Sequence, residues 1–85
     1  MPMRVAIVSP EKEVWTGEGD MVVARTTEGE IGVLPGHVPL LGILVDGGQV
    51  RVKTGDTEIT AAVDGGFLSV TSEGVSILAE RADLT

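Results

Sequence analysis

Very few side chains in this sequence could carry out chemistry, and their spacing argues against a catalytic site. There is one histidine, His37, and no cysteine among the 85 residues. A metal site needs three or four ligands, and no second histidine or cysteine is available to His37. Glu28 and Glu30 lie two positions apart, so on a strand they would face the same side and could form an acid–base pair. Hydrolysis by paired carboxylates needs a substrate cleft, which a chain of this length hardly provides. The sequence therefore predicts no catalytic residue, no metal site and no cofactor.

The glycines and the charge of the chain exclude further classes of ligand. Gly29, Gly32 and Gly36 lie close together, but no Gly-Lys-Ser/Thr motif follows them and no strand–turn–helix context surrounds them, so we expect no ATP binding. The formal net charge of −7 argues against nucleic acid and anionic lipid, which both require clustered Lys and Arg. A basic protein partner fits this charge, and a simple role of the acidity in solubility fits it equally well.

The most unusual stretch is segment 28–41, which reads EGEIGVLPGHVPLL. Pro35 and Pro39 are incompatible with a plain core strand, because proline lacks the N–H that a ladder requires and fixes φ. The apolar residues of the segment are equally unusual for a plain solvated loop; they are Ile31, Val33, Leu34, Val38, Leu40 and Leu41. The segment is therefore predicted to have a fixed, partly buried shape that presents a surface to a partner.

The elements that must position this segment are short strands. Apolar stretches recur about every 8–12 residues and are separated by glycine-containing turns, which is typical of an antiparallel sandwich or barrel. No window shows a helical apolar stripe. With Trp15 and Phe67 as the only aromatic residues, the core must be aliphatic. Trp15 could pack over an end of the sandwich or lie in an interface. We predict one all-β domain, 1–85, an antiparallel β-sandwich of about eight to ten short strands, with strands near 4–9, 19–27, 30–34, 37–45, 48–54, 57–63, 66–71 and 75–80.

The sequence lacks two features that would direct the chain into or across a membrane. The apolar runs are too short and too often broken by glycine or proline to span a membrane. The N-terminal residues also lack the apolar region of a signal peptide. We therefore expect the chain to be cytosolic, even if it docks to a membrane complex.

Several irregular motifs together resemble one protein family. Segment 28–41 resembles the signature of the epsilon subunit of F-type ATP synthases. Residues 5–10 followed by Val14-Trp15-Thr16-Gly17 resemble its first strand and the turn that follows, residues 63–70 its late hairpin, and residues 75–81 its last strand. The resemblance covers nearly the whole chain and implies a β-sandwich that corresponds to the family's N-terminal domain.

The resemblance also implies a function. Such a domain is a non-catalytic part of the central stalk, binds the gamma subunit and the c-ring, and helps to couple proton translocation to ATP synthesis on the cytoplasmic side of the cell membrane. It implies that segment 28–41 faces the neighbouring rotor subunits, with Glu30 placed to pair with Arg or Lys of the c-ring loops. The helical hairpin that follows in this family, with its inhibitory role and nucleotide motif, is not part of these 85 residues. The interface residues expected on this basis are Glu28, Glu30, Pro35, His37, Pro39 and Leu40.

Two alternatives remain open from the sequence. One is a free-standing acidic β-sandwich that binds another protein. The other is a lipoyl-like carrier, because Lys53 lies near an expected hairpin tip, although the residues around it differ from a carrier motif. Association with other synthase subunits would separate the first alternative from the epsilon-type function, and intact mass would reveal a carrier.

Overall fold

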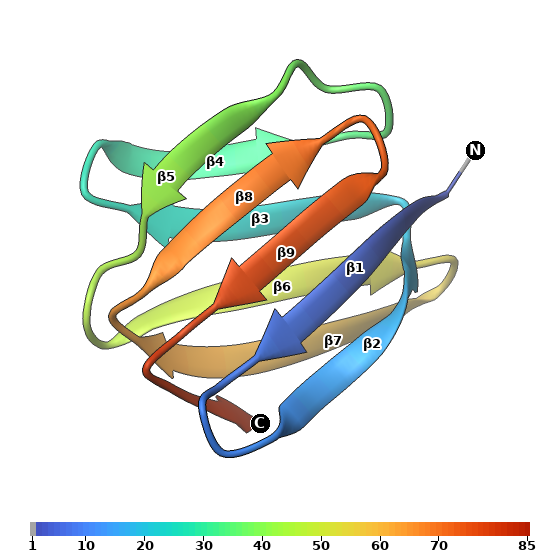
Figure 1. Ribbon diagram of the computed structural model, residues 1–85. Coiled ribbons are helices and arrows are strands. Elements are labelled where there is room, and N and C mark those ends of the chain that lie inside the picture. Colours follow the sequence, from blue (N-terminus) through green and yellow to red (C-terminus); the bar gives the residue numbers. More distant parts are fainter. Residues whose placement is uncertain (1) are drawn as a thin grey trace.

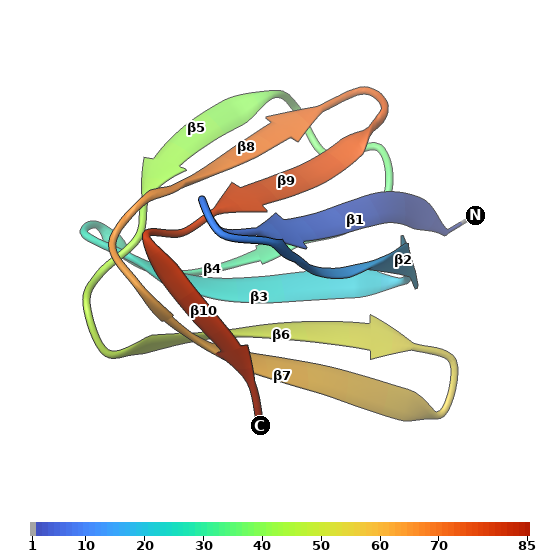
Figure 2. The same cartoon turned by 60° about the horizontal axis from the view of Figure 1, so that its bottom comes forward.

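The computed structural model describes residues 2–85, which form two five-stranded β-sheets packed face to face (Figure 1). Sheet A has the strand order β2-β1-β9-β8-β5, and sheet B has the order β10-β7-β6-β3-β4. A turned view separates the two layers (Figure 2). This arrangement confirms the predicted all-β sandwich. The strands are β1 (Met3–Val8), β2 (Glu13–Gly19), β3 (Met21–Thr26), β4 (Gly29–Val33), β5 (Leu40–Ile43), β6 (Gly48–Thr54), β7 (Thr57–Asp64), β8 (Phe67–Thr71), β9 (Gly74–Leu78) and β10 (Arg81–Leu84).

One strand pair departs from the expected antiparallel pattern. β1 lies between β2 and β9, antiparallel to β2 and parallel to β9, with Val5 opposite Val75 and Ile7 opposite Ile77. The other pairs of neighbouring strands within residues 2–85 are all antiparallel. β1 is therefore an interior strand of sheet A, and one of its two neighbours, the central strand β9, comes from much later in the sequence.

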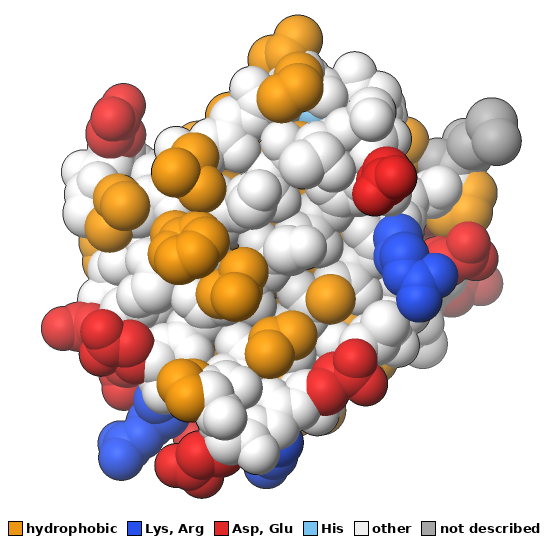
Figure 3. All heavy atoms as spheres, in the orientation of Figure 1, with side chains coloured by type: hydrophobic (Ala, Val, Ile, Leu, Met, Phe, Trp, Pro, Cys, Tyr) orange, Lys and Arg blue, Asp and Glu red, His pale blue; other side chains and the backbone are white. Residues whose placement is uncertain are grey.

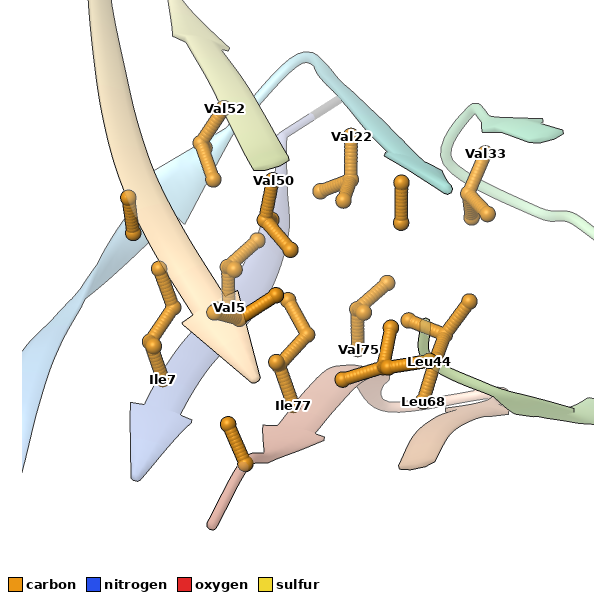
Figure 4. Packing of buried hydrophobic residues seen from close by; sticks show 14 of the residues in the cluster. Val5, Ile7, Val22, Val33, Leu44, Val50, Val52, Leu68, Val75 and Ile77 are labelled. Carbon is orange, nitrogen blue, oxygen red and sulfur yellow. The ribbon is translucent and has the colours of Figure 1, made fainter. Parts of the chain in front are cut away.

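The core between the sheets is aliphatic, as the composition predicts. Alternate residues of each strand point inward, so that Val50 and Val52 of β6 are buried while Arg51 between them points outward. Side chains from both sheets meet in this layer (Figure 4). Trp15 is partly buried and packs against the core, and Phe67 is exposed on the outside. The largest fully buried side chains are Ile7, Leu68, Ile77, Val5, Val22, Val33, Val50 and Val52.

The structure contains two strands that the sequence pattern did not predict, β2 and β10. Both are edge strands, and each has a neighbour on one side only. The expected strand over residues 37–45 is also shorter than predicted. It begins at Leu40, because residues 34–39 hold the Pro35–Gly36 turn and Pro39. Proline cannot supply the N–H that would extend the ladder.

The predicted glycine turns are confirmed. Gly47, Gly55 and Gly65 have φ values of 72°, 60° and 64°, a region that residues with a Cβ rarely adopt. Gly66, with φ of 93°, also approaches β9 closely, and a Cβ at this position would lie 2.7 Å from the Cα of Ala79. Glycine at position 66 is therefore required by both backbone conformation and space.

Strands and turns account for all the regular structure of residues 2–85, so this part of the chain offers no helix that is long and apolar enough to cross a membrane.

Candidate functional site

Segment 28–41 begins in a hairpin turn and ends on an edge strand. Thr26 organises the turn between β3 and β4, since its hydroxyl accepts a hydrogen bond from the Glu28 N–H (3.2 Å) and donates one to the Gly29 carbonyl oxygen (2.8 Å). Glu28 therefore lies in a turn, and Glu30 lies in β4 opposite Arg25. The two glutamates do not face one side of a strand as an acid–base pair would require, because the turn falls between β3 and the first residues of β4.

The Pro35–Gly36 turn shapes the middle of the segment. The His37 N–H donates to the Leu34 carbonyl oxygen over 3.0 Å, and Gly36 has φ of 85°. Proline followed by a glycine with positive φ is the pattern of a type II turn. Leu34 and Val38 on either side are exposed, so the turn presents apolar side chains to solvent. This matches the fixed, surface-presenting shape predicted from the sequence.

His37 is partly exposed and hydrogen-bonded within the loop. Its Nδ1 atom lies 2.7 Å from the Val38 carbonyl oxygen, to which the protonated nitrogen donates. This contact fixes the orientation of the ring and leaves Nε2 available to a partner. No group of three or more His, Cys, Asp and Glu side chains in residues 2–85 is placed to hold a metal ion.

The six residues expected at an interface fall into three places. Glu28 and Leu40 line one hollow of about 250 Å³ together with Ile31. Glu30 lies outside this hollow, on the outer face of sheet B. Pro35, His37 and Pro39 lie in the connection between β4 and β5. The structure thus brings Glu28 and Leu40 together and separates Glu30 from them.

Glu30 is near two arginines. Its Oε1 atom lies 3.8 Å from Nη2 of Arg51, and Arg25 is directly opposite it in the β3–β4 ladder. The Glu30 and Arg51 side chains are 60% and 40% exposed, so solvent screens this ion pair and its contribution to stability is at most about 1 kcal/mol. The charge of Glu30 is therefore paired with Arg51 of its own chain but is not needed to hold the fold together.

A second candidate surface, which the sequence pattern did not reveal, covers the outer face of sheet A. Apolar side chains gather over β5, β8 and β9, and charged side chains lie toward the rim (Figure 3). Leu41 is 69% exposed and Phe67 40%, and Ile43 and Leu78 are similarly open to solvent. A hollow of about 390 Å³ adjoins Phe67 and Leu78, with Val8 and Pro10 in its lining and Glu80 as its charged residue.

The sequence contained a signal for this surface. Leu40 to Ile43 and Phe67 to Leu68 place apolar residues at consecutive positions, so that both faces of a strand carry them. A strand with one face in the core and one in water would alternate apolar and polar residues. Large apolar residues that gather on an exposed face mark a site for a partner, whereas isolated ones need no explanation.

Lys53 lies within β6, opposite Glu58 of β7, and the tip of that hairpin is formed by Gly55 and Asp56. A modified lysine of a carrier would occupy the tip itself. The position of Lys53 opposite Glu58 instead fits an ordinary cross-strand charge pair on the surface.

Comparison with known proteins agrees with the fold and the motifs. Residues 2–85 match the family described as "ATP synthase, Delta/Epsilon chain, beta-sandwich domain". The ATP synthase epsilon chain of Frankia casuarinae is 75% identical over 85 residues, with all of both chains covered. Those of Rhodococcus opacus and Thermobifida fusca are each 59% identical over 83 residues; the alignments span 96% and 94% of this chain but 68% and 61% of those longer proteins.

Solved structures show the same architecture. A chain of the Euglena gracilis mitochondrial ATP synthase, in a structure that includes the c-ring, superposes with a TM-score of 0.88 at 26% identity, over 98% of this chain and 53% of that one. A chain of the Tetrahymena thermophila enzyme, from a structure of the central stalk and c-ring, gives a TM-score of 0.75 at 18% identity, over 96% and 66% of the two chains, and supports the fold alone. The family match over residues 2–85 and the full-length identity to the Frankia protein together establish that this chain belongs to the ATP synthase epsilon chain family.

Proposed function

We propose that this chain is a rotor domain of an ATP synthase, which binds the gamma subunit and the c-ring and has no catalytic activity of its own. The observation that carries the proposal is the exposed apolar face of sheet A, with Leu41, Ile43, Phe67 and Leu78 at its centre. Family membership and the likeness to a chain from a c-ring-containing assembly support a synthase partner for that face.

The two candidate surfaces suit two different partners. The apolar centre of the outer face of sheet A suits a long-lived contact with gamma, because permanent interfaces are the more hydrophobic ones. Segment 28–41, with Glu28, Glu30, His37 and Leu40 beside the two prolines, suits the polar loops of the c-ring. Such an arrangement would place the domain at the membrane surface, on the cytoplasmic side, without insertion into lipid.

The sandwich suits a part that transmits torque. Its two sheets share one valine-rich core, and hydrogen bonds also join them at a corner, where the Thr27 N–H donates to the Ile43 carbonyl oxygen over 2.9 Å. Close-packed interiors have low compressibility and transmit strain. A domain of this kind can couple gamma to the ring mechanically and needs no chemistry of its own.

The test is capture of the gamma subunit by variants of the full chain. Phe67→Asp places a charge in the centre of the apolar face and should weaken capture about tenfold or more, because an unpaired carboxylate would be buried in the interface. Ala62→Asp introduces the same charge at an exposed position of β7, on the outer face of sheet B, and serves as the matched control. Equal capture of both variants and the unmodified chain, with melting temperatures unchanged, would contradict the gamma-binding face and favour a free-standing binding module.

A further inference from the structure

We propose that Arg25 and Arg51 form a binding site for an oxyanion, a phosphate or carboxylate group, on the outer face of sheet B. The two arginines and Glu30 line one hollow of about 380 Å³, together with Gln49 and the backbone of Gly47 and Gly48. β4, β3 and β6 lie side by side in this sheet (Figure 1). Their three charged side chains therefore line the same hollow.

Among residues 2–85, the contact between Arg51 and Glu30 is the only ion pair within 4.0 Å, so Arg25 has no carboxylate at that distance. On the outer face of sheet B, Lys53 is opposite Glu58 and Arg81 is opposite Asp64. Arg25 is opposite Glu30. The remaining cation, Arg51, is opposite the uncharged Val23 and Thr60.

Arg51 contacts Glu30, the residue opposite Arg25 in the β3–β4 ladder. This contact is 3.8 Å, which is longer than the hydrogen bonds of a well-formed arginine–carboxylate fork. Two guanidinium groups and one carboxylate line the hollow, which therefore has a net charge of +1 (two arginines less one glutamate) in a chain whose net charge is −7.

This local excess of positive charge selects the ligand. Arginine presents its donors in a planar fork that matches the two oxygens of a carboxylate or phosphate. Both arginines retain exposed side chains, and the Gln49 amide beside them adds a further donor. The group that this site would accept is therefore an acidic one, either free phosphate or an Asp, Glu or C-terminal carboxylate of a neighbouring subunit. A carboxylate of a neighbouring subunit as the ligand rests on the proposed function, whereas free phosphate as the ligand does not.

The first experiment titrates inorganic phosphate into the ¹⁵N-labelled full chain at constant ionic strength, adjusted with chloride. We expect saturable shifts confined to the amides of Arg25 and of residues 47–51, with a dissociation constant in the millimolar range. Arg25→Gln and Arg51→Gln should each weaken this binding about tenfold, as the loss of a charge-assisted hydrogen bond does. Lys53→Gln removes one positive charge from the same strand and face, where Glu58 is the partner, and should change the affinity less than about twofold.

The second experiment measures incorporation of the Arg25→Gln/Arg51→Gln chain into the synthase. Phosphate binding with normal incorporation identifies free phosphate as the ligand. Loss of incorporation that Lys53→Gln does not reproduce identifies a carboxylate of a neighbouring subunit, whether or not phosphate binds. If phosphate causes no saturable shift and the double variant incorporates normally, the site is refuted. Gamma capture and its loss in Phe67→Asp would be unaffected by that result, so the proposed function is tested separately.

Discussion

At the residue scale, His37 shows how a loop can hold a side chain in one orientation through its own hydrogen bonds. One ring nitrogen is engaged by the carbonyl oxygen of Val38, and the backbone N–H closes the turn at Leu34. The side chain is therefore held in one orientation before any partner arrives. Pre-ordering of this kind reduces the entropy lost on binding. The loop therefore gives this histidine a fixed ring orientation and no particular reactivity.

We expect His37→Ala to weaken assembly with the rotor subunits by about 1–2 kcal/mol, because it removes a pre-oriented ring from the proposed interface. The isolated chain should melt within about 4 °C of the unmodified one, since a partly exposed side chain contributes little to folding. Ser72→Ala, at an exposed turn position between β8 and β9, is the control for both measurements. Normal assembly of His37→Ala would remove His37 from the interface.

At the element scale, the two strands that the sequence did not predict, β2 and β10, both lie at a sheet edge, although the edge strand β4 was predicted to within one residue. Thr57–Asp64 and Gly48–Thr54 were predicted nearly to the residue, because they are bounded by glycine turns and carry a clear inward–outward alternation. β2 contains two glycines and a half-buried tryptophan, and β10 has Ala82 as its single buried residue. Such strands are formed by ladder hydrogen bonds to one neighbour, which leave no periodic trace in the sequence.

The candidate surfaces likewise include features that the sequence could indicate and features that it could not. The prolines and glycines of segment 28–41 indicated its shape, because each restricts the backbone locally. The proximity of Arg51 to Glu30 could not be predicted, since it depends on the register of β6 against β3 and of β3 against β4. The apolar face of sheet A likewise requires knowing which side of β8 and β9 faces the core.

The turn between β7 and β8 carries a prediction about stability. Gly66→Ala should destabilise the chain by at least about 3 kcal/mol, because it adds backbone strain to a clash with the carbonyl of Leu78. Gly55→Ala has a similar positive φ but open space around the added Cβ, and it should cost only about 1 kcal/mol. Urea unfolding of both variants separates the two causes. Equal losses would mean that the contact with β9 relaxes at no cost.

At the scale of the whole molecule, the charge and the sequence both argue against tight binding of a nucleotide. The chain has a net charge of −7 and contains no phosphate-binding loop. Calorimetric titration with ATP should therefore give no saturable heat that corresponds to micromolar affinity. Contacts of the ATP phosphates with Arg25 and Arg51 would be far weaker, in the millimolar range proposed for that site. A micromolar dissociation constant would overturn this expectation and require a nucleotide site elsewhere on the sandwich.

The parallel pairing of β1 with β9 has a consequence for synthesis on the ribosome. Val5 pairs with Val75, seventy positions later (75 − 5 = 70), so β1 must wait for the synthesis of these intervening residues before its second neighbour exists. Pairings so distant in sequence raise the contact order, and folding slows accordingly, toward milliseconds to seconds for all-β domains. During that interval the inner side of β1, with Val5 and Ile7, is uncovered and open to wrong partners. The sandwich thus depends on β9 to protect β1, and its folding can finish only after β9 has left the ribosome.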